Sequence, residues 1–382
     1  MQLVYITNAR FPTRKAYGVN IIRTCESLAR LGMEVTLFAP SYKRDGGADG
    51  IPCFSAHQEF KTQVIRTRID GVTWGRLGFW VNRFVFLFHI FFSKSIGRPR
   101  GKVILTRDEL SGWLLRRCGY TVFYDLHGFP PRKSRLWEKA IRDMSGIIVT
   151  SPSKVERVHA LGVSPEKIVV APNGFDPALF GFNANREALR VQLNLPRERK
   201  IAMYTGHLYD WKGVFVLARA ALLLPDVYFV FVGGTPWDID AFKKKYGVLP
   251  NVIIVGYKPN EIIPQYLKAA DVLVLPNSRL SHDRVFAAHS ESDTSPIKLF
   301  EYMASGVPIV ASDLPSIREV LGEENSILVA PDNSEALRDG IETVLRGHSF
   351  VDTLSARALS DSKHYTWGKR AEKIARFISA NV

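Results

Sequence analysis

The sequence has few of the features that mark secreted or metal-binding proteins. It contains three cysteines, Cys25, Cys53 and Cys118, which are far apart and odd in number. This pattern predicts neither a disulfide framework nor a zinc site. The chain begins directly in a strand-like run, without a basic segment followed by an apolar leader. We therefore expect a protein of the reducing cytoplasm.

A long hydrophobic run is also missing. Residues 77–92 form the most apolar window, but a spanning helix needs about 20 apolar residues, and this window contains Asn82, Arg83 and His89. Two interpretations stay open. The window is either a core helix that precedes the next strand, or an interfacial helix that inserts its aromatic face into a lipid leaflet. The basic residues on both sides keep the second interpretation open.

Positive charge is concentrated in the first half of the chain. Residues 1–180 carry 27 Lys and Arg against 14 Asp and Glu, whereas residues 181–382 carry 24 against 23. Such asymmetry predicts an anionic partner for the first half, either a membrane leaflet, a lipid diphosphate or a nucleic acid. Zinc-finger spacings and aromatic RNA-binding patterns are absent from the sequence, so we expect no nucleic acid partner.

The 382 residues, 46% of them hydrophobic, are enough for two domains with separate cores. Short β-branched runs alternate with helical patterns through the first half, and the alternation starts afresh at Lys200. This is typical of α/β proteins with two doubly wound parallel sheets. We expect domains over residues 1–180 and 181–365, followed by a closing helix within residues 366–382.

The most informative stretch lies between Ser292 and Leu321. A turn of small and proline residues precedes an amphipathic helix over 297–304, which stops at Gly306, and a buried strand follows over 307–311. The N-terminus of a helix offers unpaired N–H groups and about half a positive charge, which suits a phosphate. Glu301, one turn further along, could accept hydrogen bonds from a sugar or ribose hydroxyl.

This stretch closely resembles the donor-sugar motif of the retaining glycosyltransferases of the GT-B fold. That motif has two acidic residues separated by seven positions, here Asp293 and Glu301, although the first is normally glutamate. The resemblance implies that Asp293 binds hydroxyls of the donor sugar and that Glu301 holds the ribose. It also implies that backbone N–H groups bind the diphosphate along the segment Ser295, Pro296, Ile297 and Lys298.

The loop Gly206–Gly213 resembles the family's Gly-Arg-Leu…Lys-Gly signature, in which arginine and lysine clamp the donor pyrophosphate. Lys212 matches the lysine, while His207 stands where the family has arginine. From the residues alone, a lysine in a loop after a strand can bring a compact charge to a diphosphate. We expect Gly206, His207 and Lys212 to bind the donor.

Two further positions match the family. His127 follows a strand and precedes Gly128, and it resembles the histidine that contacts the transferred sugar near its anomeric centre. Gly18, before the first long helix, resembles the glycine-rich loop that approaches the donor phosphates. The turn Asn173–Asp176 matches the family's hinge between domains, and we interpret it as structural.

The resemblance implies a GT-B fold with two Rossmann-like domains facing across a cleft, and a last helix that crosses back to the first domain. We expect a retaining, metal-independent hexosyltransferase that needs no cofactor and has His127, Lys212 and Asp293 in the catalytic site. It would take a nucleotide diphosphate sugar and a glycan or lipid-linked acceptor at the inner face of an anionic membrane, in synthesis of capsule or lipopolysaccharide. The alternatives are a sugar-nucleotide epimerase of the same fold and a degenerate protein that only binds a sugar nucleotide or a membrane.

Overall fold

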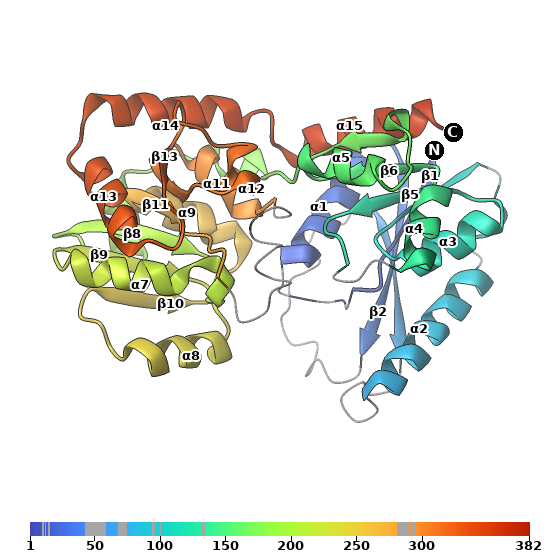
Figure 1. Ribbon diagram of the computed structural model, residues 1–382, viewed down its shortest axis with the longest axis horizontal. Coiled ribbons are helices and arrows are strands. Elements are labelled where there is room, and N and C mark those ends of the chain that lie inside the picture. The colour runs from blue at the N-terminus through green and yellow to red at the C-terminus, as the bar shows by residue number, and fades with distance from the viewer. Residues whose placement is uncertain are drawn as a thin grey trace. The chain divides into compact units, whose positions relative to one another are not determined.

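The chain forms two units, each built around one parallel sheet (Figure 1). The computed structural model describes residues 1–9, 11, 13, 16–42, 59–67, 75–93, 96–99, 101–130, 134–280, 291 and 295–382. The first unit comprises Met1–Pro172 together with Trp367–Val382, and the second comprises Asn173–Thr366. The division thus falls at Pro172, ahead of residue 180, and the C-terminal segment groups with the first unit.

The first unit has seven parallel strands in the order β3-β2-β1-β4-β5-β6-β7. In chain order they are β1 (Gln2–Ile6), β2 (Glu34–Tyr42), β3 (Lys61–Thr67), β4 (Lys102–Thr106), β5 (Thr121–Leu126), β6 (Gly146–Val149) and β7 (Ile168–Val170). The order reverses between β1 and β4. In open α/β sheets, ligands bind beyond the carboxyl ends of the strands at such a switch point.

Helices cover both faces of this sheet because strand side chains alternate between two cores. Leu3 and Tyr5 face the core under α1 (Ala16–Arg30) and α15 (Trp367–Ala380). Neighbouring Val4 and Ile6 face the opposite core. The helices that cover this second face are α2 (Gly75–Phe92), α3 (Glu109–Arg117), α4 (Arg135–Asp143) and α5 (Ser153–His159).

Helix α2 carries the apolar window and presents two different faces. Phe86 and Ile90 are buried in the core against the sheet, and Leu87 is also buried. The opposite face exposes five large aromatic side chains, namely Trp80, Phe84, Phe88, Phe91 and Phe92. One face of α2 is therefore part of the core, as the first interpretation predicts. The other face is an exposed aromatic surface. Among the described helices, none is both long and apolar enough to cross a membrane.

The second unit has six parallel strands in the order β10-β9-β8-β11-β12-β13, so its switch point lies between β8 and β11. In chain order the strands are β8 (Lys200–Thr205), β9 (Val227–Val232), β10 (Val252–Gly256), β11 (Val272–Leu275), β12 (Ile309–Ser312) and β13 (Ile327–Val329). Both sheets are parallel and flanked by helices, so the predicted α/β class is confirmed.

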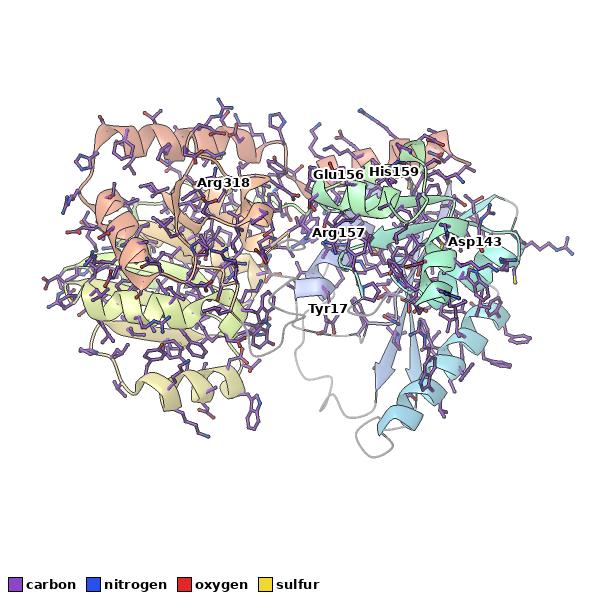
Figure 2. All side chains as sticks on the ribbon, in the orientation of Figure 1. Tyr17, Asp143, Glu156, Arg157, His159 and Arg318 are labelled. Carbon is purple, nitrogen blue, oxygen red and sulfur yellow. The ribbon has the colours of Figure 1, made fainter. Side chains whose placement is uncertain are left out.

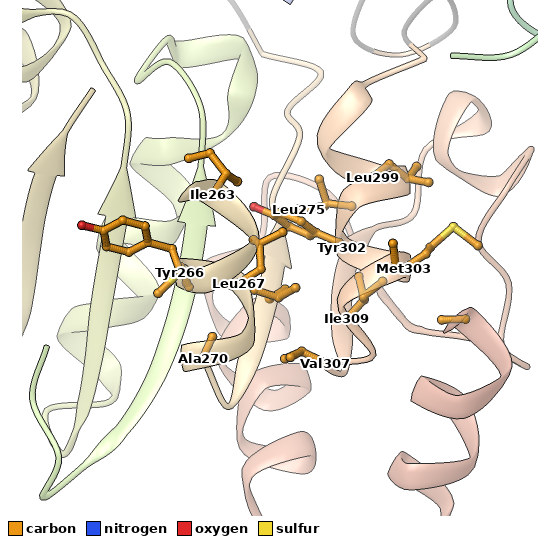
Figure 3. Close-up of a cluster of buried hydrophobic side chains, with 14 of the residues drawn as sticks. Ile263, Tyr266, Leu267, Ala270, Leu275, Leu299, Tyr302, Met303, Val307 and Ile309 are labelled. Atoms are coloured by element: carbon orange, nitrogen blue, oxygen red, sulfur yellow. The ribbon is translucent and has the colours of Figure 1, made fainter. Parts of the chain in front are cut away.

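Two cores enclose the second sheet. One lies under α6 (Arg186–Gln192), α9 (Ile263–Ala269), α11 (Ile297–Ser305) and α12 (Pro315–Arg318). Figure 3 shows part of this core, with side chains of α9 and α11 meeting above β11 and β12. The other lies under α7 (Val214–Leu223), α8 (Pro236–Tyr246) and α13 (Ser334–Leu345), while α14 (Ser349–Ser362) contributes to both. Together these elements bring the ends of β8 and β11 and the start of α11 to one edge of the sheet.

Candidate functional site

Two residues of the loop after β8 have positive φ angles that favour glycine, and one of them also packs directly on a neighbouring backbone. A Cβ atom on Gly213, whose φ is +73°, would lie 1.5 Å from the carbonyl oxygen of Pro276 at the end of β11. A Cβ atom on Gly206, whose φ is +125°, would lie 3.0 Å from Nζ of Lys298 in the first turn of α11. Only glycine adopts such positive φ angles without strain. Gly206 and Lys298 were both predicted to bind the donor. In the structure they are neighbours.

Two lysines at this edge of the sheet lack an acidic partner at ion-pair distance among the described residues. The Nζ atom of Lys212 lies 3.9 Å from the centre of the Trp211 ring, and Nζ of Lys298 lies 3.8 Å from that of the Tyr204 ring. Burial lowers the pKa of Lys212 to about 7. Burial and the charge of Lys212 hold the pKa of Lys298 well below its ordinary value, although the nearby charge of Glu301 raises it. An anion bound at this edge would favour the charged forms of both lysines.

Helix α11 begins at this edge without a side-chain cap in the described part of the chain. Its N-cap residue is Pro296, which has no N–H, so Pro296 cannot donate the backbone hydrogen bond predicted for it. The carbonyl of Ser295 accepts a 2.6 Å hydrogen bond from Nδ2 of Asn173, which fixes the entry to the helix. Glu301 is buried within α11. Asp293, predicted to contact the sugar, lies outside the described residues.

His207 is turned toward α8. Its Nδ1 lies 3.1 Å from Oδ2 of Asp238, and its ring stacks on Tyr209 with a centroid distance of 4.8 Å. Asp238 also closes a capping box with Thr235 at the start of α8. The carboxylate of Asp238 offsets the charge that a protonated His207 would carry. Asp238 and Asp240 have the spacing of an Asp-x-Asp motif, but in the part of the chain described here no three His, Cys, Asp or Glu side chains form a group that could hold a metal ion.

In the first unit, the predicted histidine belongs to a buried polar cluster. Asp125, at the end of β5, is fully buried and accepts hydrogen bonds from Tyr5 at 3.0 Å, Arg107 at 3.0 Å and Arg370 at 2.6 Å. His127 Nε2 lies 3.1 Å from the same carboxylate. The cluster joins β1, β4, β5 and α15, and it positions the imidazole at the carboxyl edge of the sheet.

The charges in this cluster set the protonation states of its members. Although burial raises it, the charges of Arg370 and Arg107 hold the pKa of Asp125 well below its ordinary value. Burial and the charge of Arg107 lower the pKa of His127 to about 3, against the opposite effect of Asp125. His127 is therefore a neutral imidazole at physiological pH, suited to hydrogen bonding rather than to carrying a charge.

The chain on either side of His127 and the start of α1 are fixed by packing. The guanidinium of Arg157, which Figure 2 labels on α5, lies 3.9 Å from the centre of the Phe129 ring, two residues after His127. Gly18 follows Tyr17 in the first turn of α1 (Figure 2). A Cβ atom on Gly18 would lie 2.5 Å from the side chain of Thr13. The structure thus explains this glycine by a close contact within the protein.

One further residue of the second unit was not predicted. Asn277, directly after β11, is fully buried, and neither atom of its side-chain amide has a hydrogen-bond partner among the described residues. Its backbone nitrogen would lie 3.3 Å from a Cβ atom on Gly213, which places it against the Lys212 loop. A buried amide without partners is rare and often marks a place where a ligand binds. Asn277 followed a strand in the sequence, but nothing there signalled its burial.

Comparison with known proteins identifies the family. The family description "Glycosyltransferase Family 4" matches residues 18–179, and "Glycosyl transferases group 1" matches residues 185–360. Together the two matches span most of both units. The chain therefore belongs to the group 1 glycosyltransferases and has the GT-B fold.

Individual relatives are distant. TuaC of Bacillus subtilis, a glycosyltransferase named for teichuronic acid biosynthesis, is 27% identical over 54% of this chain and 48% of its own length. A D-inositol 3-phosphate glycosyltransferase of Jonesia denitrificans is 25% identical over 63% and 58%. The matched region thus spans about half the length of these curated relatives.

Solved structures resemble the whole chain. Sucrose-phosphate synthase from Thermosynechococcus elongatus has a TM-score of 0.77 at 21% identity, covering 100% of this chain and 99% of its own. HepE from Anabaena, solved in complex with UDP, has a TM-score of 0.75 at 19% identity, and the two chains cover each other fully. At these identities the likeness establishes the fold.

Proposed function

We propose that the protein transfers a sugar from a nucleotide diphosphate sugar to a glycan or lipid-linked acceptor. The observation that carries this proposal is the pair Lys212 and Lys298 at the switch point of the second sheet, beside the N-terminus of α11. Nζ of Lys298 is buried, Lys212 is partly buried, and neither has an acidic partner at ion-pair distance among the described residues, so it is costly to charge them in the free protein. A diphosphate would neutralise both.

The proposed chemistry separates a sugar from its leaving group. The bond between the anomeric carbon and the diphosphate oxygen breaks as the bond to the acceptor oxygen forms, and the acceptor proton passes to a diphosphate oxygen. Lys212 and the N–H groups at the start of α11 would stabilise the charge that develops on the diphosphate. These groups supply positive charge at the leaving group, so we propose a reaction that needs no metal ion or other cofactor.

The remaining roles follow the family resemblance. Glu301 would accept hydrogen bonds from the ribose, Asp293 from the donor sugar, and neutral His127 would bond to the transferred sugar. Neither of the described candidates is placed as a nucleophile: His127 is bound to Asp125, and Glu301 is buried in α11. We therefore propose retention by attack of the acceptor on the face from which the diphosphate departs.

The comparisons suggest where to look for the substrates. HepE has been solved in complex with UDP-glucose as well as with UDP, which makes uridine diphosphate sugars the first donors to test. TuaC is named for biosynthesis of teichuronic acid, and WaaG for lipopolysaccharide biosynthesis. By analogy we propose a role in assembling a cell-surface polysaccharide at the inner face of the membrane.

An acceptor-dependent nucleotide release assay tests the proposal. The purified protein is incubated with UDP-, GDP- and ADP-sugars, with and without a lipid extract from the source cells, in the presence of EDTA. The expected result is nucleotide release with one donor only when extract is present, reduced at least a hundredfold by Lys212→Met. Lys268→Met is the matched control, because that half-buried lysine binds the carbonyls of Phe180 and Phe182.

The same assay separates the alternatives. An epimerase would isomerise or hydrolyse its donor without extract. A degenerate binding protein would be stabilised by a nucleotide and would release none under any condition. Either result contradicts the proposed transfer.

The aromatic face of α2 supports a peripheral membrane contact. Trp80, Phe84, Phe88 and Phe92 recur at intervals of four residues, so they form a single stripe along the helix, and Phe84 and Phe92 are 63% and 74% exposed. An aromatic surface on a domain with an excess of positive charge matches an anionic leaflet, which offers both an apolar interior and negative headgroups. We propose that α2 lies in such a leaflet and brings the first unit to a lipid-linked acceptor.

Sedimentation with vesicles tests this contact. Wild-type protein is expected to sediment with phosphatidylglycerol vesicles and less with phosphatidylcholine vesicles. The double variant Phe84→Ser, Phe88→Ser should lose most of the binding. Trp237→Ser, at an 84% exposed tryptophan on α8, should bind like wild type. Two results would contradict the membrane assignment. One is a wild-type protein that does not sediment, and the other is a wild-type dimer that only the double variant abolishes.

A further inference from the structure

The proposed donor site lacks the arginine that the family signature has for the donor diphosphate. His207 stands at that position in the sequence, but its Nδ1 is bound to the carboxylate of Asp238. When His207 is protonated, its charge and that of Asp238 cancel, so the two residues together bring no net positive charge to a diphosphate. A second cation must therefore come from elsewhere if the leaving group is to be neutralised.

Lys298 has the properties of that cation. Its Nζ atom is buried and has no hydrogen-bond partner among the described residues, and it lies next to Gly206, the first residue of the loop that carries His207 and Lys212. The same atom lies 3.8 Å from the centre of the Tyr204 ring. A lysine with three N–H donors and no acceptor is incompletely bonded in the free protein.

The surroundings of Lys298 point to an anion with more than one charge. Lys212 is close enough for its charge to act on Lys298, and this repulsion is unfavourable in the free protein. The unpaired amide of Asn277, which lies against the Lys212 loop, offers another donor on the same edge of the sheet. A diphosphate satisfies two cations and a neutral donor together, whereas a single carboxylate would leave one of them unpaired.

We propose that the side chain of Lys298 is the second diphosphate cation of this protein and compensates for the histidine at position 207. This inference rests on the proposed function, since it assumes that the anion is the diphosphate of a sugar nucleotide. It assigns to Lys298 a side-chain role in addition to the backbone role predicted from the sequence.

Calorimetric titration with UDP, uridine and inorganic pyrophosphate tests the inference. In wild type, UDP and pyrophosphate should bind much more tightly than uridine. Lys298→Met should raise the dissociation constants of UDP and pyrophosphate at least tenfold and leave that of uridine unchanged. The melting temperature of the free variant should rise, because a buried amino group without a hydrogen-bond partner among the described residues is removed. Lys268→Met, at a lysine that donates to two carbonyls, should leave the dissociation constants unchanged and lower the melting temperature.

Proton uptake gives a readout that a merely structural lysine would not change. In buffers of different ionisation enthalpy at pH 8, UDP binding to wild type should take up about one proton for each lysine that becomes charged on binding. Lys298→Met should take up fewer protons than wild type. If Lys298→Met does not fold, Lys298→Gln gives the same comparison.

The possible outcomes distinguish this inference from the function on which it rests. Normal UDP affinity and proton uptake in Lys298→Met would overturn the role of Lys298 and leave transfer intact. Binding of pyrophosphate that depends on Lys298, in a protein that releases nucleotide from no sugar donor, would support the cation site and overturn the transferase.

Discussion

The Nε2 atom of His127 lies 3.1 Å from Oδ2 of Asp125, and this contact decides which ring nitrogen carries the proton. An ionised carboxylate only accepts hydrogen bonds, so Nε2 must be the protonated nitrogen and Nδ1 remains an acceptor. The protein thus presents a neutral histidine with a defined tautomer at the edge of the first sheet.

His127 should not titrate at physiological pH. Because its pKa is lowered to about 3, the imidazole signal of His127, identified by its loss in His127→Asn, should stay constant between pH 5 and 8 in NMR spectra. The same signal should titrate when the protein is unfolded in urea. A midpoint between pH 5 and 8 in the folded protein would refute the neutral assignment.

The same shift affects stability in acid. The unfolded chain takes up a proton at His127 as the pH falls below about 6.5, while the folded protein does not until about 3. Within this window, each unit by which the pH falls therefore lowers the free energy of unfolding by about 1.4 kcal/mol through this group. Urea titrations at pH 6 and 5 should show a smaller loss in His127→Asn than in wild type. Equal losses would contradict the prediction.

Arg370 should be the strongest single anchor of α15. Its side chain is buried, donates to Asp125 at 2.6 Å and also bonds the carbonyl of Ala171. Arg370→Ala removes one partner of a buried ion pair, which costs about 3 kcal/mol or more. Thermal unfolding should shift down by several degrees.

The neighbouring Lys369→Ala serves as control for α15. Lys369 is 53% exposed and forms a surface ion pair with Glu372, so its loss should change stability by less than about 0.5 kcal/mol. Equal effects of the two substitutions would show that the buried cluster does not hold the helix.

Gly213 should be intolerant of any side chain. Gly213→Ala places a Cβ atom 1.5 Å from the Pro276 carbonyl oxygen, so the loop that carries Lys212 must move. Gly347→Ala is a matched control, because Gly347 has the same φ of +73° and no atom within 4 Å of the added Cβ. Gly347→Ala should cost about 1 kcal/mol.

Gly213→Ala should cost clearly more and weaken nucleotide binding, as measured by urea unfolding and calorimetry. Similar costs for both variants would mean that the close approach of the two loops is not required.

Much of the second unit could be predicted because its signals are local. The helix before Gly306, the strand after it and the loop from Gly206 to Gly213 are each specified by residues close together in the sequence. The strands β3 and β13 were not predicted. β3 lies at a sheet edge and is less uniformly apolar than the central strands, and β13 has only three residues.

The polar contacts could not be predicted because their partners are distant in sequence. Asp125 meets Tyr5, Arg107 and Arg370 only when β1, β4 and α15 assemble. The engagement of His207 with Asp238 likewise depends on how α8 packs. A pattern can identify a lysine such as Lys298, but whether its ammonium finds a partner is decided by the folded structure.

The most direct test of the account is the pH dependence of donor binding. The nucleotide sugar that stabilises the protein most in a thermal-shift screen should be titrated into wild type and Lys212→Met between pH 6 and 9. The pKa of Lys212 is about 7 in the free protein, and a diphosphate binds its charged form. We therefore expect a dissociation constant that rises above pH 7, by up to about tenfold per pH unit for each lysine, and much weaker binding in Lys212→Met. Tight binding that is independent of pH and unchanged in Lys212→Met would contradict it.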